Sequence, residues 1–242
     1  VQIEDGTFDI TAGGGAANSQ KTHESDMPGG GMSQNIERPD GESMPRMGEK
    51  PDGENMPQDT TTDESGTSTK GIKAGGGMYL NGGTYQIDSA DDSIHSNANI
   101  TIADGTYTLA TGDDGVHADD ALTVNGGTIT VTESYEGLEG LTVTINDGTI
   151  DITASDDGIN TAGEKMELNG GYIHILAGGD GVDSNGDLTI NGGEIYIDGP
   201  SDNGNSAIDY GDRSSAYVNG GTLVAIGSSG MAEVMSDSSK QE

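Results

Sequence analysis

Asp113-Asp114-Gly115-Val116-His117-Ala118-Asp119 is the stretch that decides the fold, because its frame of two acids, a glycine and an aliphatic residue recurs along the chain. The other copies are Asp91-Asp92-Ser93-Ile94-His95, Tyr135-Glu136-Gly137-Leu138-Glu139, Asp156-Asp157-Gly158-Ile159-Asn160, Gly179-Asp180-Gly181-Val182-Asp183 and, more loosely, Ser206-Ala207-Ile208-Asp209. The second acidic position falls at residues 92, 114, 136, 157 and 180, in steps of 22, 22, 21 and 23. A fixed period of this length predicts a repeat protein with one coil per repeat.

A second marker keeps the same period half a repeat away. Its copies are Asn81-Gly82-Gly83-Thr84, Ala103-Asp104-Gly105-Thr106, Asn125-Gly126-Gly127-Thr128, Asn146-Asp147-Gly148-Thr149, Asn169-Gly170-Gly171-Tyr172, Asn191-Gly192-Gly193-Glu194 and Asn219-Gly220-Gly221-Thr222. Asn-Gly and Gly-Gly favour positive φ, so each copy predicts a sharp turn. We expect the asparagines to stack into an inward amide ladder that caps these turns.

Short stretches of alternating polarity lie between the turns, such as Ile100-Thr101-Ile102 and Tyr107-Thr108-Leu109. A period of two is typical of half-buried strands, and no helical period is visible. A third apolar column follows the acids and contains Ile94, Val116 and Leu138. The sequence therefore predicts an all-β protein, a right-handed parallel β-helix whose rungs are about 22 residues long and about 4.8 Å apart.

The chain divides into four parts by composition. Residues 1–15 are expected to form the first rung, residues 70–229 the main β-helix, and residues 230–242 a polar tail or cap. The insertion at residues 16–69 holds five of the six prolines and five of the nine methionines. It is either a solvated loop or a segment that packs along the coil through its methionines.

Composition excludes several classes of function. A net charge of −33 disfavours nucleic-acid binding and contact with an anionic membrane. No apolar run approaches the roughly 18 residues of a membrane span, and no leader is recognisable. Because the chain starts within an expected strand at Val1, we expect a trimmed product. The absence of cysteine rules out disulfides and thiolate metal sites.

Stacking of the rungs brings the acids of the frame together. The candidate metal ligands are Asp91, Asp92, Asp113, Asp114, Glu136, Glu139, Asp156, Asp157, Asp180, Asp183 and Asp209. Two carboxylates about 5 Å apart repel by roughly 3 kcal/mol at an effective dielectric constant of 20. The bases outside the insertion are Lys70, Lys73, Lys165, Arg213 and Lys240, and we expect none of them at this column.

Cations are therefore the expected compensation, and oxygen-rich sites favour several Ca²⁺ ions along the column. The frame glycine is expected to make a tight turn that directs backbone carbonyls to the ion. His95 and His117 could tune such a site or accept a hydrogen bond. Zinc is disfavoured, because these two rings would need further partners of their own kind. The alternative is an exposed acidic edge with loosely bound counter-ions.

The combination of Lys70-Gly71-Ile72-Lys73-Ala74, the Asp-Asp-Gly-Val-His frame and Ala154-Ser155-Asp156-Asp157-Gly158-Ile159-Asn160 resembles the carbohydrate-binding β-helix family of clostridia and related bacteria. The resemblance covers about residues 1–15 and 70–232. It implies a pectate-lyase-like β-helix that binds calcium, attaches to cellulose and acidic cell-wall sugars, and is secreted or attached to the cell surface. Ser93 in place of glycine and the weak rung ending at Asp209 depart from the pattern.

We therefore expect a calcium-stabilised extracellular protein that binds plant or bacterial cell-wall polysaccharide. Asp151, His174 and Tyr196 in one outward column, and Tyr217 in another, are the candidate sugar contacts. The main alternative is a filament subunit that associates end to end and is hardened by calcium. A polysaccharide lyase is disfavoured, because lyases that act on uronates need a strong base beside the calcium.

Overall fold

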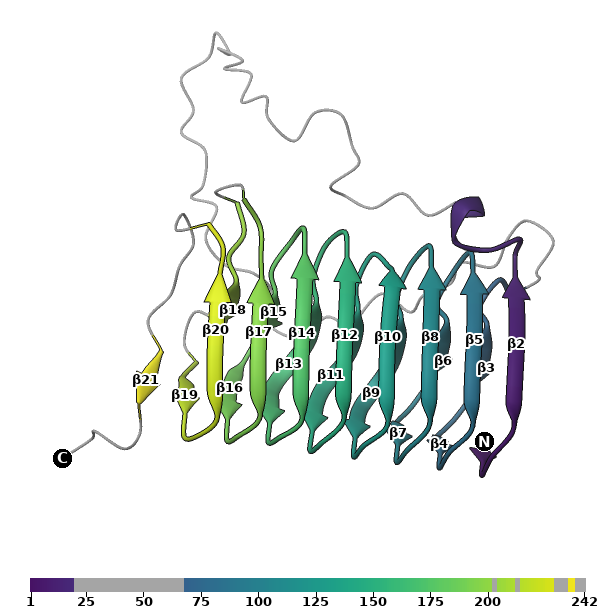
Figure 1. Cartoon of the computed structure of the whole chain (residues 1–242), viewed down its shortest axis with the longest axis horizontal. Coiled ribbons are helices and arrows are strands. Elements are labelled where there is room, and N and C mark those ends of the chain that lie inside the picture. The colour runs from purple at the N-terminus through teal and green to yellow at the C-terminus, as the bar shows by residue number, and fades with distance from the viewer. Residues whose placement is uncertain (20–67, 202–203, 212–213, 229–234, 238–242) are drawn as a thin grey trace, which may run out of the picture.

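The chain folds into a parallel β-solenoid, which confirms the predicted all-β class (Figure 1). The computed structural model describes residues 1–19, 68–201, 204–211, 214–228 and 235–237. Within these residues the single helical element is a short 3-10 turn, η1 (Ala16–Asn18). No helix of the described chain is long and apolar enough to cross a membrane. Most of the insertion and of the polar tail lies outside the described residues.

Two sheets of parallel strands build the coils (Figure 1). The eight-stranded sheet runs in the order β2 (Thr7–Ala12), β5 (Thr84–Ser89), β8 (Thr106–Thr111), β10 (Thr128–Glu133), β12 (Thr149–Ala154), β14 (Tyr172–Ala177), β17 (Glu194–Asp198) and β20 (Thr222–Ile226). Neighbouring strands are in register, for example Asp151 with His174 and His174 with Tyr196. Equivalent residues of successive repeats therefore stack in columns.

The thirteen-stranded sheet covers two further sides of the coil. Its main path is β1 (Gln2–Ile3), β4 (Met78–Leu80), β7 (Ile100–Ile102), β9 (Val116–Val124), β11 (Leu138–Ile145), β13 (Ile159–Leu168), β16 (Asp187–Ile190), β19 (Ala216–Val218) and β21 (Ser236–Asp237). The strands off this path are β3 (Ile72–Ala74), β6 (Ile94–Ser96), β15 (Val182–Ser184) and β18 (Ile208–Tyr210). The long strands β9, β11 and β13 continue round the corner, because β9 pairs with β6 at its start and with β7 at its end.

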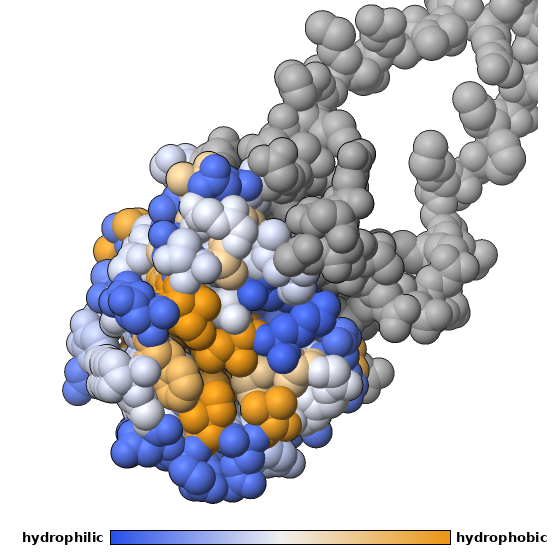
Figure 2. Space-filling model, turned by 90° about the vertical axis from the view of Figure 1, so that its right-hand side faces the viewer, coloured by the Kyte–Doolittle hydropathy of each residue, from blue (hydrophilic) through white to orange (hydrophobic). Residues whose placement is uncertain are grey.

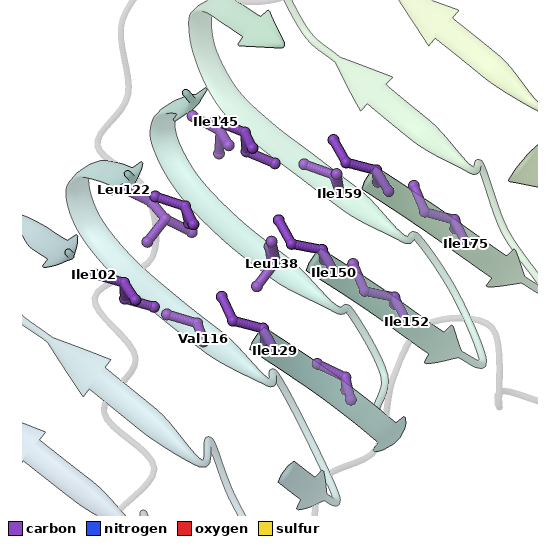
Figure 3. Close-up of a cluster of buried hydrophobic side chains, with 14 of the residues drawn as sticks. Ile102, Val116, Leu122, Ile129, Leu138, Ile145, Ile150, Ile152, Ile159 and Ile175 are labelled. Carbon is purple, nitrogen blue, oxygen red and sulfur yellow. The ribbon is translucent and has the colours of Figure 1, made fainter. Parts of the chain in front are cut away.

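The core consists of stacked aliphatic side chains (Figure 3). Val116, Leu138 and Ile159 lie in register on β9, β11 and β13, and each is 0% exposed. Ile129 and Ile150 form a second column on the facing sheet. Burial of each aliphatic side chain contributes about 1.5–3 kcal/mol, so the repeat pattern is also the pattern of the hydrophobic core.

An aromatic stack occupies the core beside the turns of the first coils. The ring centroids of Phe8 and Tyr85 lie 4.8 Å apart, and those of Tyr85 and Tyr107 lie 4.5 Å apart, with nearly parallel planes. Both tyrosine hydroxyls donate to a turn carbonyl, of Gly82 and Asp104, at 2.8 Å. These hydrogen bonds allow a polar ring atom to lie at the edge of an apolar column.

The asparagine turns form an amide ladder, but on the outside of the coil. Nδ2 of Asn146, Asn169, Asn191 and Asn219 donates to Oδ1 of the asparagine one coil before, at 2.7–2.9 Å. Most of these side chains are exposed. The predicted ladder is therefore confirmed, whereas its inward direction is wrong, because the aromatic and aliphatic columns already fill the interior.

The frame glycine serves close packing between coils. Gly158 does not have a positive φ, and a Cβ there would lie 2.3 Å from Ile175 Cγ2 and 2.5 Å from the carbonyl oxygen of Gly181. The carbonyls of the frame acids accept hydrogen bonds from the neighbouring coil, as in Gly158 N to Asp180 O at 2.9 Å. Close packing therefore explains this glycine, and the expectation that its turn directs backbone carbonyls to an ion stays a prediction.

Candidate metal and carbohydrate sites

The frame acids form a continuous column, which we call the acidic ladder, in the loops that lead from the eight-stranded sheet into the thirteen-stranded sheet. Beside it runs a column of polar residues at the second position of each following strand. In register along the solenoid, its members are Lys73, His95, His117, Glu139, Asn160, Asp183 and Asp209. The ladder therefore presents imidazole nitrogens in two early coils and mainly carboxylate oxygens later.

In the part of the chain that the structure describes, five groups of three side chains bring their ligand atoms within 4.8 Å of one another. They are Asp91–Asp92–Asp113, Asp92–His95–His117, Asp114–His117–Glu139, Glu136–Asp156–Asp157 and Asp157–Asp180–Asp183. The predicted ligands thus meet as expected, except that Asp209 belongs to none of these groups. Asp157 is shared by the last two groups.

Lys70 lies at the ladder, so the prediction that no lysine does is wrong. Its Nζ is 3.0 Å from Asp91 Oδ1 and 2.5 Å from Asp92 Oδ2, and all three side chains are almost fully buried. The signal was present in the sequence: one step of 22 residues back from Asp92 leads to residue 70. Lys70 thus occupies the acidic position of the first coil and neutralises part of the second.

His117 supplies a second positive charge to the early coils. Its Nδ1 lies 3.2 Å from Glu139 Oε2 and 3.3 Å from Asp114 Oδ2. Burial lowers the pKa of His117, but the hydrogen bond to Asp114 and the charges of the surrounding carboxylates outweigh it and raise the pKa to about 9. Burial and the charge of Asp114 nevertheless raise the pKa of Glu139 to about 8. One imidazolium therefore does not neutralise all the carboxylates around it.

The later coils have no such compensation. Within the described residues, no lysine, arginine or histidine forms an ion pair with Glu136, Asp157 or Asp183. Burial, followed by repulsion from neighbouring carboxylates, raises the pKa of Asp157 to about 8 and that of Asp183 to about 7. The same causes raise the pKa of Glu136 well above its usual range. At neutral pH these groups must therefore take up protons or a cation.

One amide in this region fits an oxygen-ligated cation. Asn160 Nδ2 donates to Glu136 Oε2 at 3.0 Å, while Asn160 Oδ1 is buried without a hydrogen-bond partner. It is the one such side-chain atom among the described residues, and a buried acceptor of this kind calls for a water or an ion. Together with Asp156 and Asp157, these groups supply the hard oxygen donors that Ca²⁺ prefers.

A different kind of site lies on the outer face of the eight-stranded sheet, over β12, β14 and β17. His174 Nδ1 and Asp151 Oδ1 are 2.9 Å apart and exposed. Tyr196 follows them in the same column, and its ring lies 5.8 Å from that of Tyr172 at an angle of 41°. The column predicted from the sequence is therefore confirmed in its geometry. Tyr217 does not join it, since β19 belongs to the other sheet.

Tyr172 was not among the predicted sugar contacts, although its position two residues before His174 places it on the same side of the strand. It is 43% exposed. An open hollow beside it is lined by Asp147, Thr149, Tyr172, Glu194 and Thr222, with glycines of the turns. Rings, carboxylates and hydroxyls thus lie on one surface, which is the combination that sugar rings and their hydroxyls contact.

A parallel solenoid with an acidic ladder and an exposed aromatic face places the protein in the class of elongated repeat proteins. A family model described as "Carbohydrate-binding domain-containing protein" matches residues 1–115 and 113–239. The chain therefore belongs to the family of carbohydrate-binding domain-containing proteins. No match was found among curated proteins or among solved structures.

Proposed function

We propose that the protein binds cell-wall polysaccharide through the outer face of the eight-stranded sheet, and that calcium ions stabilise the later coils. The observation that carries the proposal is the surface of Tyr172, His174 and Tyr196 in a chain of a carbohydrate-binding family. The eight-stranded sheet runs along the length of the solenoid (Figure 1), and the hollow on its outer face is open. Such a surface suits an extended polymer better than a small sugar.

Neutral sugar chains match this surface chemically. Tyrosine rings can stack on the apolar faces of pyranose rings, and Asp151, His174 and Glu194 offer donors and acceptors to hydroxyls. Cellulose is the simplest polymer with these properties. Because such contacts involve no ion pairs, we expect binding to cellulose to depend little on salt.

Acidic polysaccharides such as pectin require a different explanation. The chain has 42 acidic residues against 9 basic ones, so direct ion pairs with uronate carboxylates have few donors. Calcium supplies charge neutralisation and open coordination positions for sugar oxygens. The residues that would hold it are Glu136, Asp156 and Asp157 with Asn160, and Asp157 with Asp180 and Asp183. Partners of this kind are found in cell walls, so we propose an extracellular location.

A pull-down on cellulose and on polygalacturonate, across a calcium series, tests the function. Circular dichroism in parallel reports whether the coil remains folded. Chelator should abolish binding to polygalacturonate before the coil unfolds, whereas cellulose binding should persist as long as the fold does. Binding to neither polymer would contradict the proposal, and calcium-independent binding to polygalacturonate by folded protein would contradict the bridging role of calcium.

Lyase activity is not part of the proposal. Lys70 lies at the ladder, but its Nζ is buried and hydrogen-bonded to Asp91 and Asp92. It therefore cannot approach a sugar carbon as a base without breaking two ion pairs. His117 is held in the same way by Asp114 and Glu139.

End-to-end assembly is a second candidate, favoured by the open end of the solenoid. Viewed from the β2 end, apolar side chains gather at the centre of the end face, between hydrophilic residues (Figure 2). Phe8 and Ile10 are only partly buried, and among the described strands β2 pairs with β5 alone. Such an edge can accept a strand from another chain. Light scattering over a concentration series should then show growth beyond a monomer, and a constant monomer mass would exclude it.

A further inference from the structure

We propose that Lys70 and Asp91 form an intramolecular isopeptide bond, with Asp92 as the group that transfers the protons. The bond joins the coil that begins at β3 to the coil that begins at β6. Both reacting groups and the carboxyl group of Asp92 already meet in one buried cluster. The cross-link does not depend on the proposed function, because its argument uses only the geometry and chemistry of these side chains.

The backbone holds Lys70 in a fixed position on the neighbouring coil. Gly71 N donates to the carbonyl oxygen of Asp92 at 2.9 Å, and Ile72 N donates to that of Ser93 at 2.9 Å. A Cβ on Gly71 would lie 2.6 Å from the carbonyl oxygen of Ser93, so the two segments pack closely. The side chain of Lys70 therefore extends to the carboxyl groups from a hydrogen-bonded, closely packed backbone.

The amine and both carboxyl groups lie within hydrogen-bond distance of one another. Lys70 Nζ is 3.0 Å from Asp91 Oδ1 and 2.5 Å from Asp92 Oδ2. The side chains of Lys70, Asp91 and Asp92 are 2%, 4% and 0% exposed. Groups held at such distances and well oriented react as though their concentration were about 10⁵–10⁸ M. The nucleophile and the carbon that it attacks are therefore brought together by the fold.

The hydrogen bonds distinguish the roles of the two carboxyl groups. Asp91 Oδ1 accepts the backbone N–H of Asp92 at 2.9 Å, and such a donor stabilises the negative charge that develops on this oxygen when the carbon is attacked. Asp92 Oδ2 has the shorter contact to Lys70 Nζ and lies 2.8 Å from His95 Nδ1. Asp92 is therefore placed to take a proton from the amine, and Asp91 is the group that is attacked.

The reaction is a condensation that needs no oxidant, reductant or other reagent. The ammonium group of Lys70 gives a proton to Asp92, and the neutral Nζ attacks Cγ of Asp91. An N–C bond forms, and one C–O bond of Asp91 breaks. The proton held by Asp92 and a second proton from Nζ leave with that oxygen as water. One ammonium and one carboxylate thus become an amide and one water molecule, and Asp92 returns to its initial state.

Burial and position favour the amide over the ion pair. Two buried ions carry a desolvation cost that their attraction offsets only in part, whereas an amide is neutral. The amide also closes a ring between residues 70 and 91, which restricts the unfolded chain as a disulfide does. Among the described strands β3 pairs with β6 alone. The bond therefore fastens a terminal strand to its one neighbour.

Mass spectrometry of the whole chain in denaturant tests the bond. The purified chain should be lighter than its sequence requires by one water molecule, and its digest should contain a branched peptide that joins Lys70 to Asp91. Lys70→Arg keeps the positive charge but lacks the amine, so it should have the full sequence mass. Asp92→Asn should have the full mass too, because an amide does not accept the proton. Lys73→Arg, at the exposed lysine of β3, is the matched control and should lose the water.

Three results would overturn the proposal. The first is the full sequence mass in the parent chain, a result that requires no variant to fold. The second is a loss of water that persists in Lys70→Arg, which would indicate a succinimide at an Asp-Gly sequence such as Asp104-Gly105. The third is a branched peptide that ends at Asp92, or a bond that still forms in Asp92→Asn. Circular dichroism shows whether each variant is folded.

Discussion

The substitution Asp157→Asn should stabilise the protein in the absence of calcium and destabilise it when calcium is bound. Asp157 is shared by two ligand groups, so the substitution weakens both of them. Its Oδ1 accepts the backbone N–H of Asp180 at 2.6 Å, and the amide oxygen of asparagine can keep that bond. The variant therefore removes a charge while it retains the shape and the hydrogen bond.

The magnitude without calcium follows from the pKa of Asp157, which rises from 3.8 to about 8 on folding. At pH 7 a difference of about three pH units corresponds to ~4 kcal/mol as an upper limit. Partial exposure and relaxation reduce this to about 2 kcal/mol. In chelator, Asp157→Asn should therefore be more stable than the parent chain by about 2 kcal/mol.

With calcium at a hundred times its dissociation constant, each occupied site adds about 2.7 kcal/mol to the parent chain. The variant should lose most of this gain at two sites and become the less stable protein. Urea unfolding in chelator and in millimolar calcium measures both differences, with the exposed Asp198→Asn as a control of equal charge. A variant that is less stable than the parent chain in both buffers would refute the reasoning.

Three further predictions follow from the same geometry. In chelator, the free energy of unfolding should fall as pH rises from about 4 to about 8, because the raised pKa values of Asp157 and Asp183 mean that the folded state keeps protons which the unfolded state releases. In calcium this dependence on pH should flatten. A stability in chelator that does not change with pH would contradict the burial of these charges. Lys70→Met should destabilise the chain by about 3–5 kcal/mol, because Asp91 and Asp92 lose their buried cation; a loss below about 1 kcal/mol in urea unfolding would show that they are solvated. Gly158→Ala should cost roughly 1–3 kcal/mol with or without calcium, because its Cβ would meet the neighbouring coil, and a neutral result would refute that packing.

The periodic features of the fold could be predicted from the sequence. Val116, Leu138 and Ile159 recur with the acids, and a parallel solenoid is the arrangement that stacks such residues in one interior column. The outward column of Asp151, His174 and Tyr196 followed from the same alternation. In both cases the spacing of the repeats in the sequence predicts which residues of successive coils stack in one column.

Features that break the repeat were harder to predict. Lys70 stands where later coils have an acid, and its role depends on burial beside Asp92, which composition does not reveal. The buried acceptor of Asn160 depends on which of its two amide atoms faces Glu136. Asp119 Oδ1 lies 3.6 Å from His95 Nε2 because β9 continues round the corner of the coil.

Binding isotherms on cellulose test the central claim most directly. The double variant Tyr172→Ala/Tyr196→Ala removes both rings of the outer face, whereas Tyr79→Ala removes a ring that is 50% exposed on the thirteen-stranded sheet. Stacked rings contribute about 0.5–1.5 kcal/mol each, so the double variant should bind about 5- to 150-fold more weakly, and Tyr79→Ala should bind like the parent chain. Equal affinity of all three folded proteins, or a loss confined to Tyr79→Ala, would contradict the assignment of carbohydrate binding to this face.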